Sequence, residues 1–366
     1  MFNSTKVKKM LTGSAVPILF LVISAIAIPI SKLSANYLMT EVLARLTRNL
    51  FLVLSLLLPV MAGMGINFGM VLGAMAGQIG LVFVTAWEIS GVPGLLISAL
   101  IGTPIAILLG YFGGVVLNHA KGREMITSMM LGLFIAGVYQ FFLLYLCGSV
   151  IPINNKSTIL SRGYGVRNTL SLPVAGGFDS LLVLNVGPLH IPLVTIAIIA
   201  LLCLFTVWFR KTKMGQDMRA VGQDMSVAGT AGIAVEKNRI LSVIISTILA
   251  CYGQIIYLQN IGTLNTYNGS DQAALFAAAA LLVGGASVSK ATISNAIFGT
   301  ALFHLMFVVM PVAGKNITGQ AVLGEYLRMF ISYGIVTTSL IIHAWKRQKD
   351  KEIDRIAMRR DSARER

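Results

Sequence analysis

The chain has 366 residues, of which 56% are hydrophobic and only 12% are charged, and its mean hydropathy is +0.80. Apolar runs long enough to cross a bilayer recur along the whole chain, and a soluble domain has no use for so many of them. An ordinary soluble protein is therefore excluded. The net charge of +15 needs no nucleic acid partner, because basic loops that face anionic lipid account for it.

A spanning helix needs about 20 mainly apolar residues, because only a helix satisfies its own backbone polar groups within lipid. The sequence predicts about ten such helices and hence an all-α, polytopic membrane protein. In chain order they cover residues 11–30, 50–66, 69–87, 93–118, 125–147, 191–209, 240–258, 273–288, 291–310 and 326–345. Residues 1–345 are expected to form a single transmembrane domain, and residues 346–366 a basic cytoplasmic tail.

The distribution of basic residues gives an independent test of this topology, because short loops rich in Lys and Arg stay in the cytoplasm. Ten crossings place both termini on the same side of the membrane. If that side is the cytoplasm, 21 of the 29 Lys and Arg residues lie inside and 8 lie outside. The charge bias therefore favours ten spans with both termini cytoplasmic.

One polar segment interrupts the apolar chain between the sixth and seventh predicted spans. It reads "MGQDMRAVGQDMSVAGTAGIAVEKNR" from Met214 to Arg239, and its apolar residues recur at helical spacings of three and four. An amphipathic helix, or two short ones, is predicted on the cytoplasmic side. Gly215, Gly222 and Gly229 are seven residues apart, which indicates close approach by a partner or breaks between short helices. A loop that rests on lipid headgroups is the alternative.

The wider run "KTKMGQDMRAVGQDMSVAGTAGIAV" resembles the cytoplasmic loop of permease subunits of bacterial ATP-binding-cassette importers. The branch is the one that serves ribose-type sugars, nucleosides and branched-chain amino acids. The matching positions are Thr212, Gly215, Arg219, Ala220, Val221, Gly222, Gly232 and Ile233. Two further segments, "GINFGMVLG" (65–73) and "ALLVGGASVSKATISNAIFGTAL" (280–302), are similar to the same branch. Asn67 departs from the Asp frequent in sugar permeases, Ala286 departs from a common Thr, and "REMITSMMLGLF" (123–134) is closer to the nucleoside-type pattern.

This resemblance implies a permease of the bacterial cytoplasmic (inner) membrane. Its partners would be cytoplasmic ATPase subunits, an extracytoplasmic solute-binding protein and a second permease, either a copy of this chain or a different one. The loop 211–239 would couple the permease to the ATPase through Gly215, Met218, Arg219, Ala220, Val221, Gly222, Met225, Gly232 and Ile233. The chain would bind no cofactor itself, since ATP and Mg²⁺ belong to the ATPase.

The sequence contains no ATP-hydrolysis motif of its own. A phosphate-binding loop needs GxxxxGK[ST], and the nearest segment, "GGASVSKA", has Ser289 at the second Gly and Ala291 after the Lys. No HExxH, GxSxG or paired-carboxylate motif indicates a membrane enzyme. The alternative function is a gradient-driven secondary transporter, which usually needs an Asp, Glu or His relay, and here only the isolated His304 is available.

Polar residues within spans tend to face the protein interior or a solute path. Asn67, Gln78, Gln140 and His304 are therefore candidates for the translocation route of a small polar solute, most simply a sugar or a nucleoside. Hydrogen bonding between packed helices explains them nearly as well.

In the long outer loop, Arg162 and Arg167 are candidates for docking the binding protein, and an ordinary solvated loop is the alternative.

Overall fold

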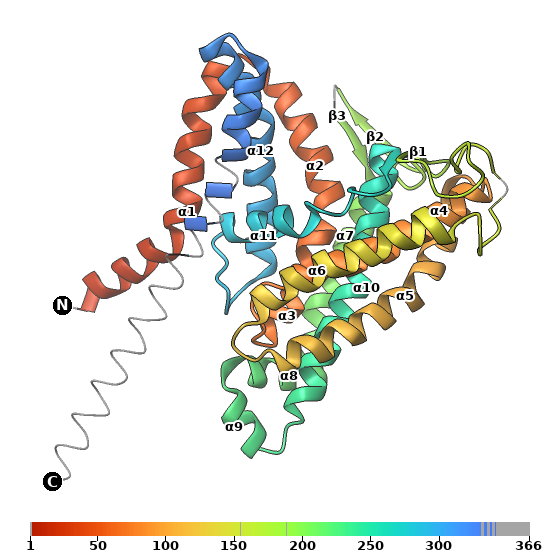
Figure 1. Cartoon of the computed structure of the whole chain (residues 1–366). Coiled ribbons are helices and arrows are strands. Elements are labelled where there is room, and N and C mark those ends of the chain that lie inside the picture. Colours follow the sequence, from red (N-terminus) through yellow and green to blue (C-terminus); the bar gives the residue numbers. More distant parts are fainter. Residues whose placement is uncertain are drawn as a thin grey trace.

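The chain folds mostly into helices in this computed structural model, which describes residues 2–153, 155–187, 189–330 and the single residues 333, 334, 337, 338 and 341 (Figure 1). The α-helices of the described part are α1 Phe2–Ser31, α2 Ala35–Ser55, α3 Leu57–Met61, α4 Val71–Ala86, α5 Gly91–His119, α6 Glu124–Phe141, α7 Leu193–Phe209, α8 Lys213–Gln223, α9 Met225–Thr230, α10 Val235–Ile261, α11 Ala273–Val283 and α12 Ile293–Thr318. A 3-10 turn, η1 Phe68–Met70, precedes α4, and a π-helical turn, η2 Phe142–Leu146, follows α6.

Two small antiparallel sheets add the only strands of the described residues. Strand β1 Thr169–Ser171 pairs with β4 Thr263–Asn265, so that Leu170 lies opposite Leu264. Strand β2 Val183–Val186 forms a hairpin with β3 Leu189–Pro192. The prediction of a helical membrane protein is confirmed at this level, with a little sheet added.

Six helical segments of the described chain are long and apolar enough to cross a membrane, namely Ala35–Met61, Phe68–Ala86, Gly91–His119, Glu124–Leu146, Val235–Ile261 and Ile293–Thr318. Helices α7 and α8 would add a seventh only as a pair, and they are bent by 73°. The apolar helices Val16–Ser31 and Ala273–Val283 are shorter. Half of the predicted tenth span and the whole of the tail 346–366 lie outside the described residues.

The second and eighth predicted spans end earlier than expected. The helical segment that begins at Ala35 stops at Met61, because Gly63 and Gly65 adopt positive φ angles of 74° and 72°. Helix α11 stops at Val283 before a pair of glycines, of which Gly285 has φ 84°. In the sequence, a glycine that packs within a helix looks the same as a glycine that ends one, so these two helix ends were not predicted.

Connections that are far apart in sequence gather at two opposite ends of the helices. Helices α8 and α9 lie at the lower end in Figure 1, and the β2–β3 hairpin lies at the upper end. The loop after α3 contacts α8 at the lower end, where a Cβ on Gly63 would lie 2.8 Å from Gly222 Cα. At the other end, the Asn316 side chain of α12 donates to Ile30 O at the end of α1.

Helix α4 is the most buried span and packs between α5 and α10. Its glycines allow this close packing, since a Cβ on Gly73 would lie 2.1 Å from Thr247 O of α10 and one on Gly80 would lie 2.3 Å from Ser98 O of α5. Small residues are typical of helix interfaces in membranes for this reason. Helices α1, α2, α11 and α12 form a second group beside the first (Figure 1).

Candidate functional site

The polar segment between α7 and α10 forms two short helices rather than one. The Thr212 side chain accepts a hydrogen bond from Gly215 N and caps α8, at 3.2 Å. Asp224 is extended, with φ −154°, and its carboxylate accepts from Ser226 N and Val227 N, which ends α8 and starts α9. The predicted amphipathic helical segment is therefore confirmed as a helix pair, α8–α9.

The apolar face of this pair packs against its own chain. Met218 is 0% exposed and Val221 is 1% exposed. A Cβ on Gly222 would lie 2.1 Å from Met61 O, so α8 touches the backbone that follows α3. The close approach expected at Gly222 is thus made within the chain, and in this structure Met218 and Val221 are covered before any partner arrives. Gly215 is buried in the same way, since its Cβ would lie 2.0 Å from Phe209 O.

The opposite face of the pair is open. Val227 on α9 is 63% exposed and Met214 is 40% exposed, although both are apolar. Arg219 and Gly232 are also exposed, whereas Ala220, Met225 and Ile233 are half-buried. The surface left for a partner is therefore the one around Val227, which the sequence analysis did not select. The only sign of this surface in the sequence is that Val227 is apolar but does not follow the helical spacing of the buried residues.

A buried ion pair lies beneath α9. Arg239 of α10 is fully buried, and its Nη2 lies 2.6 Å from Glu124 Oε1 at the start of α6. Its Nη1 lies 2.7 Å from the sulfur of Met225. Glu124, Met225 and Arg239 thus join α6, α9 and α10. By contrast, Lys121 and Glu236 form an exposed pair at 3.3 Å nearby.

Three of the predicted route residues, Asn67, Gln78 and Gln140, are buried or half-buried, but each has a packing partner. Asn67 is 2% exposed, and its Oδ1 accepts from Gly69 N at 2.9 Å, which caps η1. Gln78 accepts from the Tyr139 hydroxyl at 2.9 Å, and Gln140 donates to Tyr267 O at 3.4 Å. Capping explains why an amide stands at position 67. A role of these side chains in the route remains a prediction.

The two predicted docking residues are exposed in the loop between η2 and β1. The Arg162 guanidinium stacks on the Tyr164 ring at 4.4 Å and donates to Tyr164 O. Arg167 Nε donates to Ile159 O at 3.0 Å. Backbone contacts therefore hold both cationic groups at the surface.

Charge reversal tests the docking assignment. We expect Arg162→Glu and Arg167→Glu together to slow association with the solute-binding protein at low salt, because exposed charges steer encounter more than they stabilise a buried contact. The loss should shrink at high salt, where such charges are screened. Stopped-flow association measures this, and Arg162→Lys, which keeps the charge, is the control. Equal association rates for the reversed and unmodified chains at low salt would refute the assignment.

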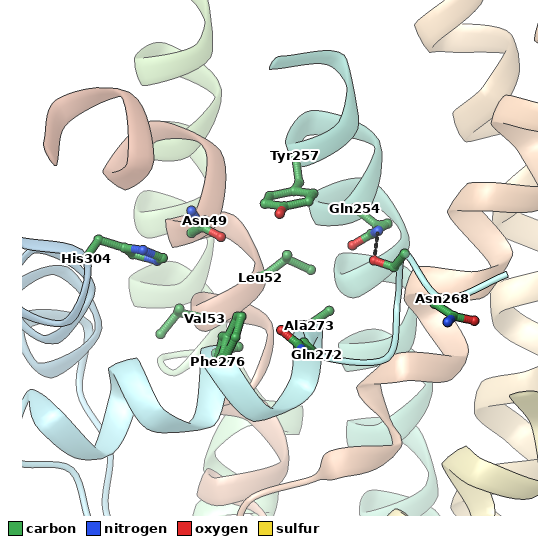
Figure 2. A pocket seen from close by; sticks show the side chains of 12 residues that line it. Asn49, Leu52, Val53, Gln254, Tyr257, Asn268, Gln272, Ala273, Phe276 and His304 are labelled. Carbon is green, nitrogen blue, oxygen red and sulfur yellow. Dashed lines mark hydrogen bonds between the residues drawn. The ribbon is translucent and has the colours of Figure 1, made fainter. Parts of the chain in front are cut away.

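A pocket of about 160 Å³, lined by both polar and apolar side chains, lies between α2, α10, α11 and α12 (Figure 2). Two aromatic rings, those of Tyr257 and Phe276, line it. Its amide and imidazole side chains are those of Asn49, Gln254, Asn268, Gln272 and His304. Figure 2 shows Gln254 pointing inward from α10 and His304 pointing inward from α12. Of the predicted route residues, His304 lines this pocket, whereas Asn67, Gln78 and Gln140 do not.

Two polar atoms of the pocket have no partner among the described residues. Gln254 Nε2 donates to Gly269 O at 3.3 Å, but Gln254 Oε1 is unpaired. His304 is 4% exposed, and its Nδ1 is also unpaired. Sequence reasoning noted His304 but missed the pocket, because its lining comes from four helices whose residues are up to 255 positions apart. Asp271, the chain neighbour of Gln272, has its carboxyl pKa raised by partial burial.

Six helical segments of the described residues that are long and apolar enough to cross a membrane define an integral membrane protein. The chain belongs to the family described as "Branched-chain amino acid transport system / permease component", whose model matches residues 38–340. It is accordingly a permease of the ATP-binding-cassette importer type and a multi-pass protein of the inner membrane. The resemblance drawn from the loop 211–239 is confirmed at the level of the family.

Two curated relatives carry permease names. The nucleoside ABC transporter permease protein NupB of Lactococcus lactis subsp. cremoris (strain MG1363) is 24% identical over 288 residues, which are 75% of this chain and 70% of NupB. The probable ABC transporter permease protein YphD of Escherichia coli (strain K12) is 32% identical over 152 residues, which are 41% of this chain and 44% of YphD. No solved structure matches the chain. These relatives are named as permeases rather than as enzymes.

Proposed function

We propose that this chain forms the membrane pathway of an importer driven by ATP hydrolysis on separate subunits. We further propose that α8–α9 transmits the movement of those subunits to the spanning helices. The observation that carries the proposal is the construction of the helix pair. One face is locked onto α3 and α10 through Gly222 and Arg239, whereas the other exposes the apolar Val227. A partner that binds the exposed face can therefore push on the spanning helices through the buried one.

The partners follow from the family. A permease component acts beside ATPase subunits and a solute-binding protein. We propose in addition a second permease subunit, and ATP with Mg²⁺ held by the ATPase alone. Exposed apolar residues such as Leu100 and Leu108 of α5, 73% and 68% exposed, fit a surface for lipid or for that second permease.

For the solute we propose a neutral polar molecule of the nucleoside class, with a simple sugar as the second candidate. The support is the nucleoside permease among the relatives and the uncharged, amide-rich lining of the pocket. No finding favours the gradient-driven alternative.

The energy source tests the proposal directly. Cells that carry the chain with its ATPase and binding protein should take up uridine after a protonophore has collapsed the proton gradient, as long as ATP is supplied. Replacement of the phosphate-binding Lys of the ATPase should abolish that uptake. Uptake that stops with the protonophore and survives the ATPase substitution would show a secondary transporter instead.

We further propose ten crossings with both termini in the cytoplasm, supported by the bias of basic residues and by the gathering of loops at two ends. Cysteines at Ser161 and Ser289, introduced singly into a chain that lacks Cys147, Cys203 and Cys251, test this. Both positions are exposed. An impermeant thiol reagent should label Ser161→Cys from outside the cell and Ser289→Cys only after the membrane is opened. Outside labelling of Ser289→Cys would refute this topology.

A further inference from the structure

We propose that the pocket lined by Gln254 and His304 is a binding site for the base ring of a nucleoside during its passage through this chain. The proposal rests on the proposed function and deepens it by assigning a site and a ligand chemistry. Of the residues that the sequence analysis assigned to the route, His304 alone takes part.

The size of the pocket fits one ring. Its volume is about 160 Å³. An apolar cavity of about 150 Å³ in another protein holds one benzene molecule. A pyrimidine ring therefore fits, and the sugar of a nucleoside would extend through the open side of the pocket.

The lining fits the two surfaces of a base. Bases are bound by stacking of their faces on aromatic side chains and by hydrogen bonds to their edges. Tyr257 and Phe276 supply aromatic rings, and Figure 2 shows them on opposite sides of the pocket. The Asn49 amide, whose Nδ2 also donates to Arg45 O at 2.8 Å, offers an acceptor and a second donor hydrogen of the kind that read base edges.

Two unpaired polar atoms of the pocket are available to a ligand. A buried polar group without a hydrogen bond is costly, so that native proteins pair nearly all of them. Gln254 Oε1 can accept from a ring N–H or an exocyclic amino group, and His304 Nδ1 can donate or accept according to its tautomer. One planar ligand between α10 and α12 could satisfy both atoms.

The charge around the pocket selects a neutral or weakly acidic solute. None of the residues that line it is Asp, Glu, Lys or Arg. The Arg48 guanidinium lies over the Tyr257 ring at 5.9 Å and donates to Asn260 Oδ1. Asn260 in turn donates to Asp179 at 2.7 Å. A cationic solute would meet the charge of Arg48 without a carboxylate in the pocket to offset it.

The test uses the whole transporter in lipid nanodiscs and a cysteine at Gln272, which lines the pocket and is exposed. Other cysteines are removed. Uridine should slow labelling of Gln272→Cys by a small thiol reagent, whereas ribose and leucine at the same concentration should not. Labelling of Ser161→Cys should be unaffected by all three.

A pair of matched substitutions tests the Gln254 amide. Gln254 and Gln259 both lie on α10, are 0% exposed and have one unpaired amide atom, but of the two only Gln254 lines the pocket. Gln254→Met should raise the half-saturating uridine concentration for uptake by about tenfold, the effect of one lost hydrogen bond to a buried ligand. Gln259→Met should leave that concentration unchanged, even if its lost bond to Phe178 N lowers the melting temperature.

The outcomes separate this proposal from the function on which it rests. If the unmodified transporter takes up uridine but uridine does not protect Gln272→Cys, or if Gln254→Met and Gln259→Met behave alike, the pocket assignment is overturned and the proposed function stands. Equal protection by ribose would overturn the base-ring assignment. If uridine is not taken up at all, the solute class fails and the pocket proposal fails with it.

Discussion

Gly222→Ala should abolish the stimulation of ATP hydrolysis by loaded binding protein and lower the melting temperature of the purified transporter. The new Cβ would lie 2.1 Å from Met61 O and 3.0 Å from Gly63 N. Both are backbone atoms, so no side chain can move aside, and α8 must shift away from the end of α3. Overpacking of this kind costs about 1–3 kcal/mol or more.

Gly229→Ala is the matched control for this prediction. Gly229 lies on α9, seven residues after Gly222, and the nearest atom to its Cβ would be Val235 Cγ2 at 3.9 Å. Ala favours a helix over Gly by about 1 kcal/mol, so that this variant should be as stable as the unmodified chain or slightly more stable. Normal solute-stimulated hydrolysis by Gly222→Ala would show that α8 need not be seated on residues 61–63.

Arg239→Met should destabilise the chain by about 3–5 kcal/mol, because it leaves the largely buried carboxylate of Glu124 without its partner. The ATPase subunits should then be lost on purification, since α9 is held to α6 and α10 through the same arginine. The double variant Arg239→Met with Glu124→Gln removes both charges and should recover most of the lost melting temperature.

The exposed ion pair Lys121–Glu236 provides the comparison with the buried pair Arg239–Glu124. Lys121→Met breaks the contact with Glu236, whose side chain is 69% exposed, and exposed pairs contribute about 0–1 kcal/mol. A thermal shift for Arg239→Met no larger than that for Lys121→Met would argue against a structural role of the buried pair.

If α8–α9 transmits the movement of the ATPase as proposed, these two contacts connect it to the membrane domain. Gly222 joins α8 to the end of the α2–α3 segment, and Arg239 joins α9 to the starts of α6 and α10. A displacement of α8–α9 therefore reaches three spanning segments through backbone contact and a buried charge rather than through flexible loops.

The apolar runs predicted helices well because burial in lipid requires both apolarity and internal hydrogen bonding. Each of the first nine predicted spans overlaps a helix. The break after Met61 was not predicted, because Gly63 and Gly73 look alike in sequence although one turns the chain and the other allows α10 to approach. Periodicity also located the helix pair α8–α9.

The sequence could not predict which face of α8–α9 is left for a partner, nor where the pocket between α2, α10, α11 and α12 lies. An amphipathic pattern shows which residues are buried, but it does not say whether the covering surface belongs to the same chain or to a partner. Met218 and Val221 are covered by the chain itself, and Val227 is left exposed. The pocket needs Asn49, Gln254 and His304 to meet, and such contacts depend on how helices pack rather than on any local motif.

The contact between α9 and the ATPase is the most direct test of the account. A photoactivatable cross-linker attached to Val227→Cys, in a chain without other cysteines, should join this chain to an ATPase subunit in membranes that contain the whole transporter. The same cross-linker on Ser161→Cys should not. If the ATPase copurifies and transport continues, but illumination yields no product between Val227→Cys and the ATPase, then α9 is not the element through which ATP hydrolysis drives this permease.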